Sequence, residues 1–131
     1  MKIIVQRAMD ASVEVDNNVV GQIDYGLVLL VGFTEGDTVK EIDYMVDKVI
    51  NLRIFDDENG VMNKSLIDID GSILSISQFT LYADTKKGNR PSYVNALAGS
   101  LASPMYDQFN NELRKFLKVE TGVFGADMQV S

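Results

Sequence analysis

The absence of histidine restricts the chemistry of this 131-residue chain more than any motif does. Histidine is the usual general base of hydrolases and the commonest metal ligand, so serine–histidine triads are excluded. Cysteine is absent as well, which removes thiolate nucleophiles, disulfides and cysteine metal sites. A hydrolase with this composition must stabilise charge with backbone N–H groups and neutral side chains, or borrow a reactive group from its substrate.

The densest group of hydroxyl and amide side chains lies in the segment SILSISQFTL, residues 72–81. There Gln78 is suited to orient a substrate, the Phe79 backbone N–H to stabilise an oxyanion, and Thr80 to hydrogen-bond the reacting centre. On spacing alone, the pattern is more typical of serine and threonine alternating on a strand face. The group comprises Ser75, Ser77, Gln78 and Thr80.

A basic patch follows, with Lys86, Lys87 and Arg90 inside five residues. The formal net charge of the chain is −7, which argues against a protein that coats nucleic acid through bulk electrostatics. Any contact with phosphate is therefore expected at this patch. Taken alone, such a patch is more typical of ordinary surface charge in a solvated loop.

The elements that position these residues begin with strands. Residues 2–7 and 12–15 have strand patterns, and turn-forming residues at 16–18 predict a hairpin whose second arm starts at VVGQI. The apolar run GLVLLVGF at 26–33 predicts a central strand covered on both faces. Residues 72–81 predict another strand, and VFGADMQV at 123–130 predicts a final one.

Two amphipathic helices are expected between these strands. Thr38 and Glu41 have capping-box spacing, and apolar residues then recur with helical period up to Ile50. FDDENG at 55–60 ends this helix as a solvated turn, because its acidic residues do not fit the spacing of a calcium loop. Ser103 and Pro104 predict the N-cap and first turn of the second helix.

Size and composition predict one domain spanning residues 1–131. Hydrophobic residues make up 46% and charged residues 24%, values close to the average of globular proteins. No stretch approaches the length of a membrane span, and charged residues interrupt any signal-like N-terminal core, so we expect a cytoplasmic protein. The order of elements predicts an α+β fold, with a mixed, barrel-like arrangement of strands packed against two main helices.

Two consecutive segments, SQFTLYAD at 77–84 and KKGNRPSY at 86–93, resemble the paired signatures of D-aminoacyl-tRNA deacylases. The resemblance extends to QRAMDASVEVDNNVVGQIDYGLVLLVGF at 6–33 and to TGVFGADMQVS at 121–131. The four matches have the same order and spacing as in the family and together cover essentially the whole chain. Chance similarity between short motifs does not explain such an agreement.

The resemblance implies a homodimer with active sites at the subunit interface. Its substrate would be the ester between a D-amino acid, or glycine mischarged on tRNA(Ala), and the terminal adenosine of tRNA. Neither a metal nor another cofactor is implied, and neither DNA nor a membrane is expected as a partner.

The same resemblance places Ser77, Gln78 and Thr80 in the active site, with Phe79 acting through its backbone amide. Thr80 is one candidate nucleophile, but participation of the 2′-hydroxyl of the tRNA suits a chain without histidine better. Ala126 and Met128 would help to form the adenosine pocket. We further expect the basic patch, formed by Lys86, Lys87 and Arg90, and its neighbour Pro91 to contact the phosphates of the acceptor stem. This expectation rests on the charge of the patch and not on the resemblance.

One family feature has no counterpart among these residues. The family carries a Gly-Pro dipeptide with a cis peptide bond just beyond the final strand, where it reaches into the partner subunit and rejects L-amino acids. Neither Pro91 nor Pro104 follows a glycine. We expect the motif to lie beyond Ser131, and the alternative is a protein without this filter. Arg7 resembles a family arginine near the motif, and is equally typical of a surface charge at a strand end.

Two other functions remain open from the sequence. The chain has no self-sufficient catalytic group, so a non-catalytic, dimeric module that binds tRNA or a nucleotide on the same fold is the main alternative. An interaction protein, whose dimer surface is its whole function, is the third hypothesis.

Overall fold

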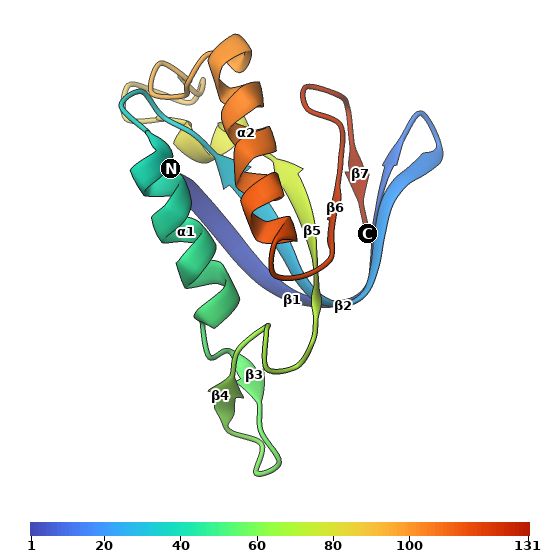
Figure 1. Cartoon of the computed structure of the whole chain (residues 1–131). Coiled ribbons are helices and arrows are strands. Elements are labelled where there is room, and N and C mark those ends of the chain that lie inside the picture. Colours follow the sequence, from blue (N-terminus) through green and yellow to red (C-terminus); the bar gives the residue numbers. More distant parts are fainter.

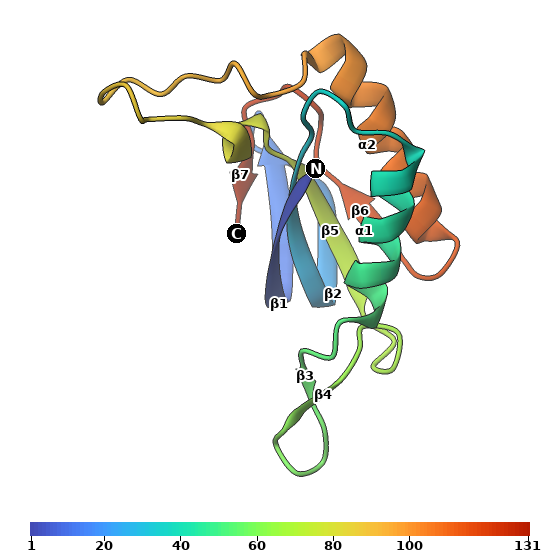
Figure 2. The ribbon, with the colours of Figure 1, turned by 90° about the vertical axis from the view of Figure 1, so that its left-hand side faces the viewer.

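The computed structural model describes residues 1–131 and contains a five-stranded mixed sheet with both long helices on one side (Figures 1 and 2). The strand order is β6-β5-β2-β1-β7, in which β2, β5 and β6 run parallel and the pairs β1–β2 and β1–β7 are antiparallel. The expected α+β fold with two main helices is therefore confirmed. The elements are β1 (Lys2–Val15), β2 (Asn18–Gly32), α1 (Val39–Asn51), β5 (Ser72–Ser77), α2 (Gly99–Arg114), β6 (Val119–Thr121) and β7 (Gln129–Val130).

Strands β1 and β2 form one long hairpin, where the sequence indicated shorter separate strands. The predicted turn is confirmed, since Asp16 and Asn17 have φ of 51° and 65°, as tight hairpin turns require. Farther along, the hairpin contains Asp10 and Gly26, which also have positive φ, of 51° and 152°. A Cβ atom at Gly26 would collide with the Ser72 carbonyl oxygen, so a glycine is needed where β2 approaches β5.

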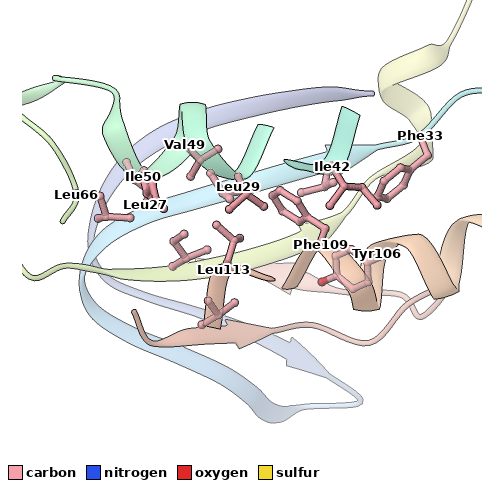
Figure 3. Packing of buried hydrophobic residues seen from close by; sticks show 14 of the residues in the cluster. Leu27, Leu29, Phe33, Ile42, Val49, Ile50, Leu66, Tyr106, Phe109 and Leu113 are labelled. Atoms are coloured by element: carbon pink, nitrogen blue, oxygen red, sulfur yellow. The ribbon is translucent and has the colours of Figure 1, made fainter. Parts of the chain in front are cut away.

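The main core lies between the sheet and the two helices. Leu27, Leu29 and Val31 of β2 are fully buried against side chains from both helices. Figure 3 shows Ile42 and Val49 of α1 and Phe109 and Leu113 of α2 pointing into this layer.

The second face of the sheet is covered only in part. Ala11, Val13 and Ile23 of the hairpin pack with Leu74 and Ile76 of β5 in a smaller core. On the same face of β2, however, Val28 and Leu30 are only half-buried, and the neighbouring Ile4 of β1 is 51% exposed. The prediction that residues 26–33 are covered on both faces is thus correct for the helix side alone. We call Ile4, Val28 and Leu30 the open sheet face.

Helix α1 begins as its sequence predicts. The Thr38 backbone N–H donates to Glu41 Oε2 at 2.6 Å, and the Thr38 hydroxyl contacts the same oxygen at 2.7 Å. Thr38 Oγ1 also accepts a hydrogen bond from the Lys40 N–H. Both halves of the capping box are therefore present.

Helix α2 begins five residues before the predicted start. Its N-cap is Ala98, and the first turn is closed by hydrogen bonds from the N–H groups of Leu101 and Ala102 to the Ala98 carbonyl. Pro104 consequently lies inside the helix rather than in its first turn. Pro104 is exposed, and its missing N–H costs the helix one backbone hydrogen bond near its start. The burial of Ala102 favours the longer helix in spite of this loss. No helix is long and apolar enough to cross a membrane.

The remaining strand boundaries also differ from the predictions. Strand β5 ends at Ser77 instead of residue 81, and a 3₁₀ turn, η1 (Phe79–Tyr82), follows it. Only Gln129–Val130 of the predicted strand 123–130 pairs with the sheet, while the short strand β6 had no clear sequence signal. Residues 55–60 include the predicted turn, which joins β3 (Phe55–Asp56) to β4 (Met62–Lys64).

We predict that Thr38→Ala lowers the free energy of unfolding by about 1 kcal/mol, the usual cost of losing a threonine N-cap. Urea denaturation measures the change. Thr85→Ala is the matched control, because Thr85 is exposed in a loop and its side chain caps no helix. An equal effect of the two substitutions would show that the cap does not stabilise the fold.

The effect of Thr38→Ala should also depend on pH. The side-chain hydrogen bond from Thr38, followed by its backbone hydrogen bond, holds the pKa of Glu41 below its ordinary value. A carboxyl whose pKa is lowered by folding stabilises the protein above its ordinary pKa, and this contribution is lost as the pH falls through the lowered value. The difference between wild type and Thr38→Ala should therefore be full at neutral pH and shrink in acid.

Candidate active site

The end of β5 borders two neighbouring cavities. The first encloses about 280 Å³ and the second about 300 Å³. The parallel strands β2, β5 and β6 point their carboxyl ends toward the same edge of the sheet, where binding sites of parallel sheets commonly form. The two cavities share four lining residues: Ser77, Gln78, Phe79 and Phe124.

The first cavity has a mainly apolar and aromatic wall. Phe33 from the end of β2, Leu97 from the loop before α2, and Ala102 of α2 contribute to it. Phe33 and Ala102 are buried. Phe79 and Tyr93 also line the cavity, yet they are 56% and 41% exposed, which places their rings at its mouth.

The second cavity faces the other side of the sheet. Leu30 of β2 and Ile76 of β5 belong to its wall, together with the segment between β6 and β7. In that segment Ala126 and Met128 line the cavity. A Cβ atom at Gly122 would collide with the sulfur of Met128, so this glycine leaves room for the methionine side chain.

The turn after β5 presents backbone donors to the cavities. The Gln78 N–H extends the sheet pairing by donating to the Val31 carbonyl at 2.7 Å. Beyond this bond the chain turns into η1, whose first hydrogen bond runs from the Leu81 N–H to the Gln78 carbonyl, so the N–H groups of Phe79 and Thr80 lie ahead of the bonded part of the turn. The first N–H groups of any helical turn lack internal partners, which makes them available to an oxyanion.

The Thr80 hydroxyl is held by its neighbour rather than by a base. Gln78 Nε2 donates a hydrogen bond to Thr80 Oγ1. No carboxylate or amine hydrogen-bonds this oxygen, and an amide donor stabilises the lone pair that a nucleophile would use. The arrangement favours Thr80 as a hydrogen-bonding group over Thr80 as an activated nucleophile.

A buried polar contact supports the site from behind. The Tyr106 hydroxyl of α2 donates to the Ser75 carbonyl of β5 at 2.6 Å, and burial raises the pKa of this phenol. The Tyr106 ring lies 5.9 Å from that of Phe124, the residue shared by both cavities. The hydroxyl oxygen of Ser75 and the side-chain oxygen of Asn110 are buried nearby without partners.

The predicted basic patch lies at the tip of an arm, residues 83–98, and none of the patch residues lines either cavity. Backbone hydrogen bonds of 2.8 Å join Asp84 and Ser92 in both directions and close the base of a loop. Residues 85–91, at the tip of this loop, are exposed and extend away from the body of the molecule (Figure 2). The tip carries Lys86, Lys87, Arg90 and Pro91.

The structure thus brings together only part of the predicted site. Ser77, Gln78 and Phe79 lie between the cavities, with Thr80 bonded to Gln78, and Ala126 and Met128 lie in the second cavity. The predicted residues at the tip of the arm, Lys86, Lys87, Arg90 and Pro91, line neither cavity.

Sequence reasoning missed Phe124, Asp127 and Tyr93 as lining residues. Phe124 and Asp127 belong to the segment TGVFGADMQVS, and Tyr93 ends the segment KKGNRPSY, so the motifs contained all three. Neither periodicity nor spacing distinguishes them from ordinary surface or core residues.

Comparisons with known proteins show the family to which the chain belongs. The chain matches a family described as D-Tyr-tRNA(Tyr) deacylase over residues 4–131. A solved structure titled "c-Myc DNA Unwinding Element Binding Protein" is similar to it, with 41% sequence identity and a TM-score of 0.93 over 99% of this chain and 89% of the other.

A second solved structure, described as a probable eukaryotic D-amino acid tRNA deacylase, is 17% identical, with a TM-score of 0.83 over 98% of this chain and 91% of the other. At this identity the likeness concerns the fold alone. The family match, by contrast, covers both long helices, the residues between the two cavities and every strand except the first two residues of β1. The chain therefore belongs to the D-Tyr-tRNA(Tyr) deacylase family, whose members hydrolyse D-aminoacyl-tRNA.

Proposed function

We propose that this deacylase hydrolyses its ester at the turn between the two cavities, with the adenine of the tRNA in the first cavity and the ribose and aminoacyl group toward the second. The observation that carries the proposal is the pair of N–H groups at the start of η1, those of Phe79 and Thr80, in a turn whose Phe79 lines both cavities. An ester placed there would have its carbonyl oxygen within reach of backbone donors.

The first cavity suits a planar base. Its wall is apolar, and Phe33 and Phe124 offer aromatic surfaces to a purine. Ala126 and Met128, which the family resemblance links to adenosine, line the second cavity, and we assign them to the ribose and aminoacyl side.

The proposed reaction needs no histidine. A water molecule attacks the ester carbonyl carbon, and the oxyanion is stabilised by the Phe79 and Thr80 amides. The 2′-hydroxyl of the terminal ribose passes a proton from the water to the departing 3′-oxygen, so that a free amino acid and a free 3′-hydroxyl result. Thr80 hydrogen-bonds the reacting centre, and Gln78 orients Thr80.

We propose D-amino acids as the main substrates and glycine mischarged on tRNA(Ala) as a further one. A filter against L-amino acids acts on the side chain at the α-carbon. Glycine has no such side chain and would pass the filter, so both esters fit one mechanism of proofreading during translation in the cytoplasm.

A homodimer would complete the site. The open sheet face, formed by Ile4, Val28 and Leu30, remains partly uncovered in one chain although its pattern predicts full burial. Leu30 also lines the second cavity, so a second copy seated on this face would place the active site at the interface.

The nucleic-acid partner we propose is tRNA and not DNA. The net charge of −7 leaves few places for phosphate, and the exposed cations of the arm are the best of them. The relative that is 41% identical carries a name that refers to DNA binding. DNA, however, lacks the 2′-hydroxyl on which the proposed mechanism depends.

The alternative is a dimeric module that binds tRNA or a nucleotide without cleaving the ester. The observation in its favour is that no carboxylate or amine hydrogen-bonds Thr80, so the chain holds no activated nucleophile of its own. Binding of D-aminoacyl-tRNA without release of the amino acid would support this alternative over hydrolysis.

The first prediction from the proposed function concerns the 2′-hydroxyl. A D-aminoacyl-tRNA that ends in 2′-deoxyadenosine should be hydrolysed about 10² to 10³ times more slowly than the natural ester, as expected for loss of acid–base participation. Thr80→Ala should lower kcat less, roughly tenfold, because it removes one neutral hydrogen bond. Single-turnover release of the amino acid measures both, with Thr85→Ala as the control. Normal cleavage of the 2′-deoxy substrate together with an inactive Thr80→Ala would identify Thr80 as the nucleophile instead.

The second prediction concerns the dimer. Ile4→Lys places a charge on the open sheet face and should convert a dimer into monomers in sedimentation, with loss of deacylase activity. Val61→Lys is the matched control, because Val61 is 58% exposed and lies between β3 and β4, away from this face. A wild-type protein that sediments as an active monomer would rule out the shared site.

The third prediction concerns the arm. Lys87→Glu should weaken tRNA binding and reduce the slope of log affinity against log salt concentration by about one for each phosphate that the arm no longer neutralises. Lys118→Glu alters the net charge equally from an exposed position at the opposite end of the sheet, and should leave the slope unchanged. Equal effects of the two substitutions would indicate general electrostatics instead of a direct interaction with the arm.

A further inference from the structure

Two aromatic rings are exposed at the mouth of the first cavity. The Phe79 and Tyr93 rings meet edge to face, with centroids 5.0 Å apart and planes 71° apart. They come from different segments, the turn after β5 and the arm. Exposed aromatic surface of this size is costly in water, and it commonly marks a place where another group stacks.

Tyr93 is held in place by the sheet and not by the exposed tip of the arm. Its carbonyl accepts a hydrogen bond from the Ala96 N–H at 3.0 Å, and the Leu97 N–H donates to the Phe33 carbonyl at 3.0 Å. The Thr34 hydroxyl also donates to the Asn95 carbonyl. The ring pair is therefore a preformed surface attached to the cavity wall.

Charge is arranged along the path that leads outward from the cavity. The arm, residues 83–98, carries three cations and one carboxylate, a net charge of 3 − 1 = +2 in a chain of net charge −7. The carboxylate, that of Asp84, accepts a hydrogen bond from the Lys86 N–H. From inside to outside, the order is apolar cavity, aromatic pair, the bridge between Asp84 and Ser92, and the cationic tip.

We propose that Phe79 and Tyr93 form a stacking platform for the base of the penultimate nucleotide of the tRNA. The inference rests on the proposed function, in which the terminal adenosine occupies the first cavity. The nucleotide before it must then cross the mouth, where the rings are exposed, and the chain continues toward the cations of the arm. Unpaired bases of RNA are typically bound by such stacking on aromatic side chains, with cations beside the backbone.

The test compares two substrates that differ only in the nucleotides beyond the terminal one. Full D-aminoacyl-tRNA has a penultimate base, whereas 3′-O-D-aminoacyl-adenosine has none. The readout is the ratio of kcat/KM for the tRNA to kcat/KM for the adenosine ester. Tyr93→Ala should lower this ratio about tenfold, mainly through a higher KM for the tRNA, as expected when one base no longer stacks on an aromatic ring.

Three further variants isolate the aromatic ring. Tyr93→Phe keeps the ring and should keep the wild-type ratio. Tyr93→Leu keeps apolar bulk without a ring, so it should lower the ratio even if Tyr93→Ala disturbs the loop. Val94→Ala is the matched control, since Val94 is 81% exposed beside Tyr93 and lines neither cavity.

The outcomes separate the inference from the function on which it rests. An unchanged ratio in Tyr93→Leu would overturn the platform, as would an equal loss of activity on both substrates, which would mean that Tyr93 shapes the adenosine cavity. A wild-type protein that cleaves neither ester would refute the proposed function and the platform with it. Cleavage of both esters by wild type, with a lower ratio only when the ring is removed, supports the platform.

Discussion

The hydrogen bond from the Gln78 N–H to the Val31 carbonyl is the constraint on which the candidate site depends. It continues the parallel pairing of β2 and β5 by one residue and fixes the point at which the chain leaves the sheet. Beyond that point the Phe79 and Thr80 amides lose access to a neighbouring strand, and the 3₁₀ turn leaves them without partners. Unpaired donors are costly in a core, but at the edge of two cavities they are available to a ligand.

The arrangement of layers explains why the cavities lie at this edge. Both helices cover one face of the sheet, and the bent hairpin covers part of the other, so the ends of the parallel strands remain accessible (Figure 2). The loops after β2 and β6 and the start of α2 then surround the end of β5. Buried contacts such as that of Tyr106 with the Ser75 carbonyl hold these parts together without entering either cavity.

The chemistry proposed for the site follows from what the chain lacks and from what it places at the turn. Without histidine or cysteine, the protein offers backbone dipoles, an amide and hydroxyl groups. Such groups stabilise developing charge well, because they are fixed in advance and carry no proton that must be moved. They are poor at activating a nucleophile, so the proposed mechanism uses the 2′-hydroxyl of the substrate for proton transfer. Because the chain as a whole is strongly acidic, the arm is the main place where it can attract the phosphates of tRNA.

Much of the local structure and the range of possible chemistry could be predicted from the sequence. The turn at Asp16 and Asn17 and the cap at Thr38 depend on neighbours within a few residues, so their signals are local. The collinear motifs predicted the family. The absence of histidine excluded mechanisms that use a histidine general base. The α+β class followed from the order of strand and helix patterns.

Tertiary structure alone decided which distant residues meet. The close approach of β2 to β5 depends on Gly26 lying against Ser72, and Phe79 meets Tyr93 only because the arm is bonded to the end of β2. The early start of α2 reflects burial of Ala102, which outweighs the local signal of Ser103 and Pro104. Hydrophobic periodicity reports whether a face is buried, but not which segment covers it, because contacts between distant parts of the chain leave no local pattern.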